Sequence, residues 1–575
     1  MRRVPWLRQI SSLIWSSFRL ASEDPAHFLI QILRKFPAER RAKLARLLFK
    51  ICHQIKHSDD ILTIEPSKND CRFPSLMALG WILLDLPQNA KPYLEIARPK
   101  AFRDSLCIVT KTSVDGMPRN TSARLEWTKG NMSAATMLAT GSLKKRLLDE
   151  KKVIERGNIS IPSQHTYIPR SDALFILTNS LPTTSSGYSH RSHALLKTAR
   201  LSGLKVYGVT RLGYPVSIGR FSRKGFDNID GITYFRSLPW KIPSLFSEKL
   251  KNQALFIVEI ARDLKPALLH STTDFQNGLV TCAAANALGI PWVYEMRGEL
   301  ENSWVARFPK EQQEIARHSE RYLALRHVET SLAKKANAVI ALSEVQKNSL
   351  VSRGVEEAKI FIVPNGVPES QLKQKRKRDF SRQHLGISPD LFVFGTISSI
   401  VDYEGLDILI KALLLLRKSK KHAYLAIVGD GVSLPQIIEL ACKHDVINYC
   451  FFPGRVSNQE ADFWYQAIDV FCVPRKDTEV TRVVTPMKSI PALSYGVPVL
   501  YSDLPALAEL VPKGHQDWLL PPNDETAWAA ALGNLSESDY DRYDIDCKKL
   551  AASRTWEQGI KIYREIYKKL EGGEI

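Results

Sequence analysis

Residues Val473 to Val499 read VPRKDTEVTRVVTPMKSIPALSYGVPV. A short apolar run at 470–474 comes before a polar segment, and a second apolar run follows Gly496. Short apolar runs that are separated by a loop and a helix-length segment are typical of buried parallel strands joined by a crossover helix. The stretch therefore predicts a strand–loop–helix–turn–strand unit of an α/β domain.

This unit contains a candidate site for an anion. Thr485 followed by Pro486 is typical of a helix start, with threonine as the N-cap and proline at the first helical position. A helix start offers free backbone N–H groups and the positive end of the helix dipole. Lys488 comes one turn later, and Arg475 directly follows the first strand. The sequence therefore predicts a binding site for a phosphate or diphosphate here.

Charge narrows the classes of partner. The chain has 575 residues, and its 80 Lys and Arg against 60 Asp and Glu give a formal net charge of +20. Such an excess favours nucleic acid, an anionic membrane surface or a phosphorylated substrate. The sequence lacks zinc-finger spacing, an RNA-binding aromatic signature and a basic helix with heptads, which argues against nucleic acid.

Cysteine usage and hydropathy indicate the compartment. The eight cysteines form no CxxC pair, which is typical of free thiols in a reducing environment. The sequence contains no run of 18 apolar residues, so we expect no spanning helix. Serines interrupt the apolar run near the N-terminus, which argues against a secretory signal. We therefore expect a cytoplasmic protein, either free or peripheral on the inner face of the plasma membrane.

Residues 1–168 are predicted to form a mostly helical extension. Helical apolar spacing recurs there, and twelve Lys and Arg crowd the first 56 positions. Two interpretations stay open for this basic segment: it binds anionic lipid, or it is a solvated face. For the first helix, a surface-lying amphipathic helix and an ordinary packed helix are likewise both open.

From Ser171 onward, short apolar runs alternate with helical segments. This alternation predicts two doubly wound parallel sheets in tandem, with a ligand cleft between them and functional residues at the carboxyl ends of the strands. A charged segment at 369–390 is interpreted as the linker. The predicted domains are a helical extension (1–168), a first α/β domain (169–385), a second α/β domain (386–552) and a closing helix (553–575).

Several stretches carry a resemblance to a known family. They are SSGYSHRSHALLKTARLSGLKV (185–206), ANAVIALSEVQKNSLVSRGVEEAKIFIVPNGV (336–367), FGTISSIVDYEGLDILIKAL (394–413), and the VGDG, PGRVS and TPMKSIPALSYGVPV motifs between 428 and 499. Together they resemble retaining glycosyltransferases of the GT-B fold, the class that includes sucrose synthase-like enzymes and the mannosyl- and glucosyltransferases of polysaccharide assembly. The resemblance covers about residues 172–570.

The resemblance implies a fold and an activity. The fold is α/β, with two Rossmann-like domains and an interdomain cleft. The implied activity moves a sugar, with retention of configuration, from a nucleoside diphosphate in the second domain to a glycan or lipid-linked acceptor in the first. It implies no cofactor and no metal. The triplet Asp539-Tyr540-Asp541 resembles a metal-binding motif of another fold, but it follows the end of the sheet and so lacks that structural context.

The resemblance and the strand ends together indicate the site residues. Arg297 and His190 are the candidate catalytic residues. The donor and diphosphate are expected at Arg475, Lys488, Thr485, Gly429, Arg455 and Ser399. The first-domain cleft loops are expected at Gly187, Gly298 and Asn365. Two alternatives stay open: Arg297 forms a salt bridge with Glu295, Glu299 or Glu301, and His190 has a capping or surface role.

The chain departs from the family pattern in two basic positions and one histidine. Many members carry Arg and Lys in the loop where this chain has Ser399 and Glu404, so we expect Lys488 to take over the basic role. The histidine that follows the fourth strand of the first domain in the family is replaced by a segment that contains Arg297.

A further departure concerns two glutamates that are separated by seven residues in the family. Neither is present; Pro491 stands at the second position, and Glu479 is the nearest acid along the chain. Proline inside the helix that is predicted to start at Thr485 would cost about 3 kcal/mol. Ribose recognition and helix geometry are therefore both expected to differ from the family pattern.

Three functional hypotheses remain. The first is a glycosyltransferase of polysaccharide or cell-envelope biosynthesis. The second, favoured by the missing glutamates, is a catalytically impaired scaffold or regulatory subunit of a polysaccharide assembly system. The third is a peripheral membrane adaptor that uses the basic N-terminal region.

Overall fold

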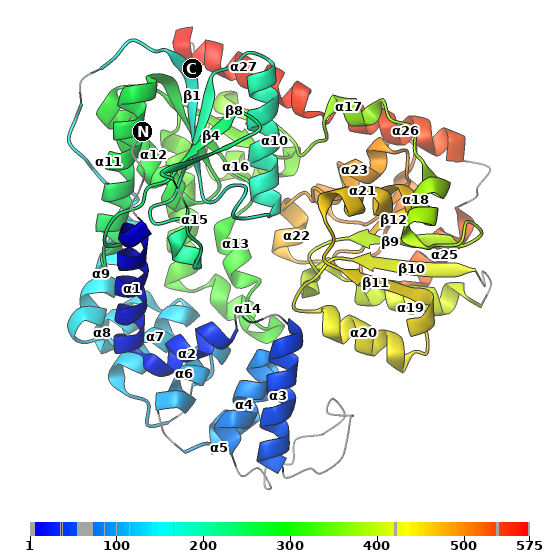
Figure 1. Ribbon diagram of the computed structural model, residues 1–575, viewed down its shortest axis with the longest axis horizontal. Helices are drawn as coiled ribbons and strands as arrows, with labels where there is room; N and C mark the ends of the chain where they lie inside the picture. Colours follow the sequence, from blue (N-terminus) through cyan, green and yellow to red (C-terminus); the bar gives the residue numbers. More distant parts are fainter. Residues whose placement is uncertain are drawn as a thin grey trace.

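The computed structural model describes residues 6–34, 36, 38–53, 73–84, 87–98, 101–113, 115–164, 166–222, 224–418, 422–535 and 540–572. A helical region comes first and two α/β domains follow (Figure 1). The expected fold class is thereby confirmed. Within these ranges, no helix is both long and apolar enough to cross a bilayer.

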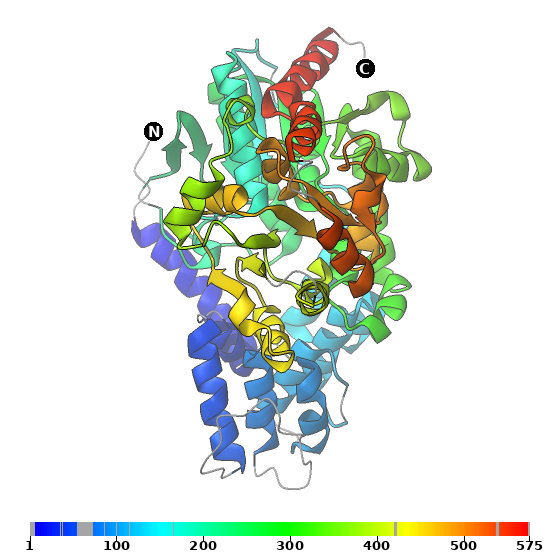
Figure 2. The same ribbon diagram turned by 90° about the vertical axis from the view of Figure 1, so that its right-hand side faces the viewer.

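The helical region lies below the two α/β domains, as Figure 2 shows from the side of the second domain. Its described helices are α1 (Trp6–Glu23), α2 (Pro25–Leu33), α3 (Ala38–His53), α4 (Pro74–Leu83), α5 (Pro87–Ile96), α6 (Ala101–Thr110), α7 (Arg119–Lys129), α8 (Met132–Leu138) and α9 (Gly141–Arg156). The region has its own apolar core, in which the rings of Phe49 and Trp81 are 4.9 Å apart. Val153 and Ile154 of α9 pack instead into the core of the first α/β domain.

The first α/β domain is built on an eight-stranded sheet with the order β3-β4-β2-β1-β5-β6-β7-β8. Only β3 and β4 are antiparallel neighbours. The strands are β1 (Ser171–Leu177), β2 (Val206–Thr210), β3 (Phe226–Ile229), β4 (Ile232–Phe235), β5 (Pro266–Thr272), β6 (Trp292–Glu295), β7 (Ala338–Ala341) and β8 (Ile360–Ile362). The helices are α10 (Gly187–Leu201), α11 (Phe246–Leu264), α12 (Phe275–Leu288), α13 (Leu300–Val305), α14 (Lys310–Arg317), α15 (Glu320–Lys335) and α16 (Glu344–Ser352).

The second α/β domain is built on a six-stranded parallel sheet with the order β11-β10-β9-β12-β13-β14. The strand order reverses between β9 and β12, and a ligand crevice is expected beyond the carboxyl ends of such strands. The strands are β9 (Phe392–Ile397), β10 (Ala423–Val428), β11 (Cys450–Gly454), β12 (Val470–Val473), β13 (Val499–Ser502) and β14 (Leu519–Leu520). The helices are α18 (Arg378–Leu385), α19 (Asp407–Leu416), α20 (Leu434–Lys443), α21 (Asn458–Ala467), α22 (Glu479–Val483), α23 (Ser489–Ser494), α24 (Pro505–Ala508) and α25 (Glu525–Asn534).

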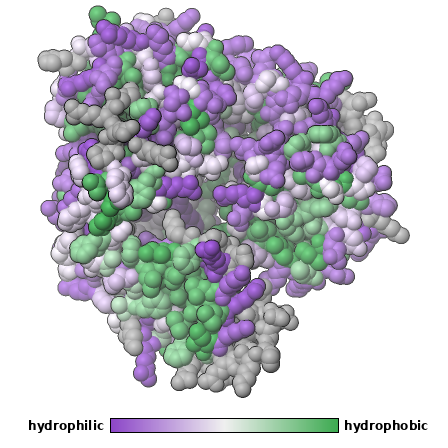
Figure 3. Space-filling view, in the orientation of Figure 1, coloured by the Kyte–Doolittle hydropathy of each residue, from purple (hydrophilic) through white to green (hydrophobic). Residues whose placement is uncertain are grey.

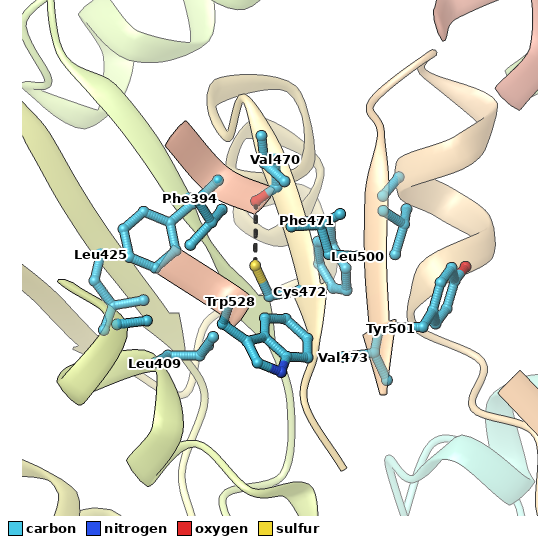
Figure 4. Packing of buried hydrophobic residues seen from close by; sticks show 14 of the residues in the cluster. Phe394, Leu409, Leu425, Val470, Phe471, Cys472, Val473, Leu500, Tyr501 and Trp528 are labelled. Carbon is cyan, nitrogen blue, oxygen red and sulfur yellow. Dashed lines mark hydrogen bonds between the residues drawn. The ribbon is translucent and has the colours of Figure 1, made fainter. Parts of the chain in front are cut away.

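The core of the second domain fixes β9 and β12 side by side. Phe394 of β9 and Cys472 of β12 are fully buried, and Trp528 of α25 packs beside them (Figure 4). Because both faces of these strands are covered, their sequences are continuous apolar runs. This packing holds the two loops that carry the candidate site.

The last two helices connect the domains. Helix α26 (Tyr540–Ala552) lies against α23 of the second domain. Helix α27 (Trp556–Gly572) returns to the first domain, where Tyr563 and Ile566 join the core beside α10 (Figure 1). The closing segment therefore ties the second domain to the first.

The interpretation of 369–390 as a linker needs correction. After the short α17 (Glu369–Leu372), helix α18 packs on α21 of the second domain. Arg382 of α18 is fully buried, and its Nη2 atom lies 2.6 Å from Oδ2 of the buried Asp469. Three of the arginines in this charged segment, Arg376, Arg378 and Arg382, are in fact held by this carboxylate.

The predicted helix start at Thr485 is wrong. Helix α23 begins at Ser489, with Lys488 as its N-cap residue. Pro491 consequently lies in the first turn, where a backbone N–H has no partner within the helix. A helix running from Thr485 would bring the proline ring against a carbonyl group four residues earlier, so the chain begins the helix later. The cost of about 3 kcal/mol that applies to proline in a helix interior does not apply here.

Candidate active site

The loops after β9 and β12 meet at the carboxyl edge of the second sheet. The loop after β9 contains the short helix η5 (Asp402–Glu404) and continues into Gly405, whose φ is +67°. A Cβ atom on Gly405 would lie 1.9 Å from the carbonyl oxygen of Pro474. Glycine allows this close approach, which places Glu404 beside Arg475.

Glu404 holds two cations at this edge. Its Oε1 atom lies 2.9 Å from Nζ of Lys488 and 3.2 Å from Nη2 of Arg475. Arg475 also donates through Nη1 to the carbonyl oxygen of Val484 at 2.7 Å. The structure thus brings together Arg475 and Lys488, as the sequence predicts, and adds a carboxylate between them. Two cations share one carboxylate, which leaves an excess of positive charge.

The charges at this cluster determine the ionisation of Glu404. Burial alone would raise the pKa of Glu404, but Arg475 and Lys488 outweigh it and hold that pKa at about 2. Burial lowers the pKa of Lys488, and Glu404 opposes that shift. Glu404 is therefore ionised at neutral pH and is bound to both cations.

The serine that contacts Lys488 is Ser398. Its buried hydroxyl accepts a hydrogen bond from Nζ of Lys488. Ser399, which the sequence indicates, is exposed, and its carbonyl oxygen accepts a hydrogen bond of 2.9 Å from the Ser398 hydroxyl. In the described structure, the contact with the cation cluster therefore lies one residue earlier than expected.

The first domain contains a second carboxylate between two cations. Glu295, the last residue of β6, is fully buried. Its Oε1 atom accepts from Nε of Arg191 at 2.9 Å and from Nε of Arg297 at 3.0 Å. Arg297 donates through Nη1 to the carbonyl oxygen of Tyr188 at 3.0 Å and to the hydroxyl of Ser192 at 2.7 Å. Arg297 therefore forms the salt bridge to Glu295 that was one of its two interpretations.

One donor group of Arg297 is left over. Its Nη2 atom is buried and has no hydrogen-bond partner among the described residues. A buried donor without a partner is costly, so it marks a place where a ligand group would be stabilised. The salt bridge and a role toward a ligand are thus compatible for Arg297.

The other side of Glu295 is sealed by α27. Its Oε2 atom accepts from the hydroxyl of Tyr563 at 2.8 Å and lies 3.2 Å from Nε2 of His270. The opposite ring nitrogen of His270 lies 2.9 Å from the hydroxyl of Tyr567. Burial would raise the pKa of Glu295, but Arg297 and Arg191 prevail and hold that pKa well below its usual range. All four partners keep this carboxylate ionised and fixed.

Three loops of the first domain contact the segment Val484 to Met487 of the second. Asn365 donates through Nδ2 to the carbonyl oxygen of Thr485 at 3.2 Å. A Cβ atom on Gly298 would lie 3.6 Å from Cγ2 of Val484, and one on Gly187 would lie 3.6 Å from Sδ of Met487. Gly187, Gly298 and Asn365 therefore lie together where the domains face each other, and Figure 3 shows the molecular surface hollowed between them.

Thr485 takes part in this contact in a different way from the expected one. It does not cap a helix, because α23 begins four residues later. Its carbonyl oxygen accepts from Asn365, whereas its buried hydroxyl has no partner among the described residues. The expected helix start at Thr485 is therefore absent, and the cations Arg475 and Lys488 lie next to an extended segment instead.

His190 lies at the start of α10, on the first-domain side. Its Nε2 atom is 2.8 Å from the hydroxyl of Ser185, within its own loop. Burial lowers the pKa of His190, and the nearby His193 lowers it further. This arrangement therefore provides a neutral imidazole that can exchange a proton with a serine hydroxyl.

Gly429 and Arg455 lie at the ends of β10 and β11. The φ of Gly429 is +137°, and a Cβ atom there would lie 1.8 Å from the carbonyl oxygen of Ser398. Gly429 thus lets the loops after β9 and β10 touch, which supports the position of Ser398. The side chain of Arg455 is exposed at the rim.

Sequence reasoning did not identify three members of the site: Glu404 as the shared carboxylate, Arg191 and Ser398. The sequence did contain a signal for the pairing of Glu404 with Lys488. Glu404 stands where many family members have a basic residue, and Lys488 is expected to take over that basic role. Arg191 follows Gly187 by one helical turn, and residues at that spacing lie on one face. Glu479, the nearest acid along the chain, is exposed at the start of α22.

Over the part of the chain that the structure describes, no group of three or more His, Cys, Asp or Glu side chains is placed to hold a metal ion. Asp539 of the Asp539-Tyr540-Asp541 triplet lies outside the described residues.

Two family models match the chain. Residues 206–366 match the Glycosyl transferase 4-like domain, and residues 388–538 match Glycosyl transferases group 1. The first match covers most of the first α/β domain from β2 onward, and the second covers the second domain. Together they account for more than half of the 575 residues.

Individual glycosyltransferases are also similar to this chain in sequence. The putative colanic acid biosynthesis glycosyltransferase WcaL of Salmonella typhimurium is 26% identical over 218 residues, which is 36% of this chain and 50% of that protein. The chain spans about half the length of four of the first curated relatives that it matches, and 71% of the alpha-monoglucosyldiacylglycerol synthase of Acholeplasma laidlawii.

Solved structures share the arrangement of the two domains. Sucrose-phosphate synthase from Thermosynechococcus elongatus has a TM-score of 0.57 at 18% identity, over 70% of this chain and 100% of that one. HepE from Anabaena, in complex with UDP and glucose, has a TM-score of 0.52 at 18% identity, over 69% of this chain and 99% of that one. With a Glycosyl transferase 4-like match on its first α/β domain and a Glycosyl transferases group 1 match on its second, the chain belongs to the glycosyltransferases of the GT-B fold.

Proposed function

We propose that this protein transfers a sugar from a nucleoside diphosphate to a glycan or lipid-linked acceptor, with retention of configuration, in polysaccharide or cell-envelope biosynthesis. The observation that carries the proposal is the pair of cations on one carboxylate at the edge of the second sheet, where Arg475 and Lys488 share Glu404. Their excess positive charge suits a diphosphate leaving group, whose developing charge is the main electrostatic demand of the reaction.

Each side of the cleft has a distinct task in this proposal. Lys488 and Arg475 bind the diphosphate, and Ser398 keeps the lysine in place. The acceptor side is lined by Gly187, Gly298 and Asn365. The Nη2 group of Arg297, which has no partner among the described residues, donates a hydrogen bond to the nucleotide-sugar or to the acceptor. In this proposal His190 contributes a hydrogen bond to the acceptor from the start of α10.

Retention in this proposal follows a front-face path without a protein nucleophile. Glu404 and Glu295 are each bound by two cations, so neither has a free oxygen directed at a sugar carbon. The phosphate of the leaving group then takes the proton of the incoming hydroxyl. The positive charge for this step comes from Arg475 and Lys488, so the proposal includes no metal ion and no cofactor.

UDP is the first nucleotide to test. The complex of HepE contains UDP and glucose, and the GT-B fold is shared with this chain. The base would lie near Gly429 and Arg455, at the ends of β10 and β11. The described cysteines Cys107, Cys282, Cys442, Cys450, Cys472 and Cys547 are free thiols, which is typical of the reducing, cytoplasmic location that we propose.

A scaffold or regulatory role in polysaccharide assembly is the second candidate. It is favoured by the proline at position 491, where the family has a glutamate for the ribose diol. The carboxylate of Glu404, at the same edge of the sheet, is already bound to Arg475 and Lys488. A missing ribose-binding glutamate and a carboxylate that is already bound to two cations are what we expect of a chain that kept the fold but lost nucleotide binding.

Calorimetric titration separates the two candidates. We expect UDP to bind with micromolar to millimolar affinity, and more tightly than ADP or GDP. A variant with Lys488→Met should lose most of that affinity, whereas Lys476→Met, whose lysine pairs with Asp402 outside the cluster, should retain it. If none of the three nucleotides bound at millimolar concentration to the folded wild-type protein, the scaffold role would replace the transferase.

A further inference from the structure

Helix α1 has its apolar face directed away from the protein. Gln9 and Ser12 are buried against the first domain, whereas Trp6 is 68% exposed and Phe18 is 66% exposed. Leu7, Ile14 and Trp15 are exposed as well. This is the reverse of an ordinary surface helix, whose apolar stripe faces the core.

The spacing of the exposed apolar residues along α1 places them on one face of the helix. At 100° per residue, Trp6, Leu7, Ile14, Trp15 and Phe18 fall within one half of the helical circumference. The buried polar residues fall within the other half. The exposed apolar side chains thus form a stripe along more than three turns rather than scattered single residues.

The polar face of α1 is fixed to the first domain. Gln9 donates through Nε2 to the carbonyl oxygen of Ser222 at 2.5 Å and accepts from the backbone N–H of Ser222 at 2.9 Å. Arg19 donates to the carbonyl oxygen of Pro243 at 3.5 Å. The apolar stripe is therefore held outward by specific hydrogen bonds.

The apolar surface continues onto the next two helices. Leu29 and Ile32 of α2, and Leu47 and Ile51 of α3, are exposed. Figure 3 shows hydrophobic surface gathered over the lower left of the molecule, where α1 and α2 lie in Figure 1. A patch that extends over three helices exceeds what single exposed apolar residues explain.

Positive charge accompanies this surface. On α3, Arg40, Arg46 and Lys50 are exposed on the same side as Leu47 and Ile51. Near α1, Nζ of Lys241 lies 4.4 Å from the ring centroid of Trp15. The first 56 residues contain twelve Lys and Arg against three Asp and Glu. Basic residues beside exposed Trp, Phe and Leu are typical of surfaces that lie in the headgroup region of an anionic bilayer.

We propose that the outward faces of α1, α2 and α3 form a docking surface for an anionic lipid bilayer. The apolar stripe of α1 enters the headgroup region, and Arg40, Arg46 and Lys50 bind lipid phosphates. Charge complementarity selects a bilayer over a neutral protein partner, since the surface combines apolar and basic groups over three helices. Because Gln9 fixes α1 to the first domain, docking holds the acceptor half of the molecule at the membrane.

Vesicle flotation tests the proposal on the full chain. Wild-type protein should float with vesicles of phosphatidylglycerol and phosphatidylcholine, and about tenfold less with phosphatidylcholine alone. The double variant Trp15→Glu/Phe18→Glu should reduce binding to the anionic vesicles by about tenfold or more, because it removes apolar area and adds repulsion. Arg46→Gln/Lys50→Gln should weaken binding and reduce its salt dependence.

Matched controls keep this test specific. Leu201 and Ile315 are each 74% exposed outside the helical region, so Leu201→Glu and Ile315→Glu should leave flotation unchanged. Circular dichroism and UDP binding should be the same in all variants, because these positions are exposed and distant in the chain from the cation cluster. Flotation does not depend on nucleotide binding, so its outcome is independent of the proposed function.

Two outcomes would overturn the proposal. One is equal flotation of the wild type and the Trp15→Glu/Phe18→Glu variant. The other is a wild-type protein that does not float and is dimeric in light scattering, but becomes monomeric in that variant. The second result would assign the surface to contact between two copies of this chain.

Discussion

The two α/β domains each hold one carboxylate between two cations, but the surroundings differ. In the first domain, Glu295 accepts from Arg191 and Arg297 on one oxygen and from Tyr563 on the other, and its side chain is fully buried. In the second domain, Glu404 binds Arg475 and Lys488, and Lys488 is partly exposed. The same charge balance thus occurs in a closed and in an open environment.

This difference separates a structural role from a binding role. A buried carboxylate whose two oxygens both have partners is costly to separate from them. The partly exposed Lys488 can bind a phosphate oxygen while Arg475 stays bound to Glu404. We therefore assign stability mainly to Glu295 and anion binding mainly to Lys488 and Arg475.

The largest expected effect is on the closed cluster. Glu295→Gln leaves Arg191 and Arg297 buried without a counter-charge, so the free energy of unfolding should fall by about 3–5 kcal/mol. Urea denaturation at neutral pH measures this loss. Tyr563→Phe is the control, because it removes one hydrogen bond to a charged group and should cost about 1.5–3 kcal/mol. Equal stability of Glu295→Gln and the wild type would contradict the closed character of this cluster.

The second effect concerns the open cluster. Lys488→Met should lower the rate of sugar transfer by about 100- to 1,000-fold, because it removes a group that stabilises the leaving diphosphate. Its free energy of unfolding should change by less than about 1 kcal/mol, as is usual for a partly exposed ion pair. Lys476→Met should change the rate less than about threefold. If Lys488→Met unfolded the protein instead, the two clusters would share a structural role.

The third effect is a pH dependence of stability. The pKa of Glu404 is held at about 2 in the folded protein, which is below the ordinary value for glutamate. A lowered folded-state pKa stabilises the protein above about pH 4.3, the unfolded value, and that stabilisation is lost as the pH falls toward 2.

The Glu404→Gln variant provides the measurement for this effect. It should be less stable than the wild type by about 3 kcal/mol at pH 7, and the difference should shrink steadily below about pH 4.3. Urea denaturation of both proteins at pH 7, 5 and 4 measures it. If the difference in free energy of unfolding between the two proteins increased on acidification, the predicted direction of the pH dependence would be wrong.

The smallest effect is expected at Pro491. Because Pro491 lies in the first turn of α23, Pro491→Ala should change the free energy of unfolding by less than about 1 kcal/mol. A gain of about 3 kcal/mol would indicate that the proline disrupts a helix interior, as the sequence alone suggests. Thermal unfolding of the two proteins side by side distinguishes these results. It also shows whether the first turn of α23, which Lys488 precedes, is strained.

Several elements could be predicted from the sequence. The runs at 470–474 and 497–501 are β12 and β13, and the alternation from Ser171 onward is two parallel-rich sheets. These predictions succeeded because a strand buried on both faces needs a continuous apolar run, which is a local property. The start of α23 was wrong because the Thr-Pro signal is local too, and a proline six residues later in the chain overrides it.

The candidate site was predictable only in part. Arg475 and Lys488 were identified because they follow a strand end and a helix signal. Glu404 was seen as a departure from a pattern, whereas in the structure it binds both of these cations. The contact requires the approach of Gly405 to Pro474, which no local pattern indicates.

By itself, the sequence determined the fold class, the order of the two α/β domains and the positive charge near the proposed diphosphate site. Only the tertiary structure decided which charges are partners. Arg475 meets Glu404 across 71 residues of chain, and Tyr563 meets Glu295 across 268. Strand formation depends on neighbours along the chain, whereas these pairs depend on where loops and the last helix end in space.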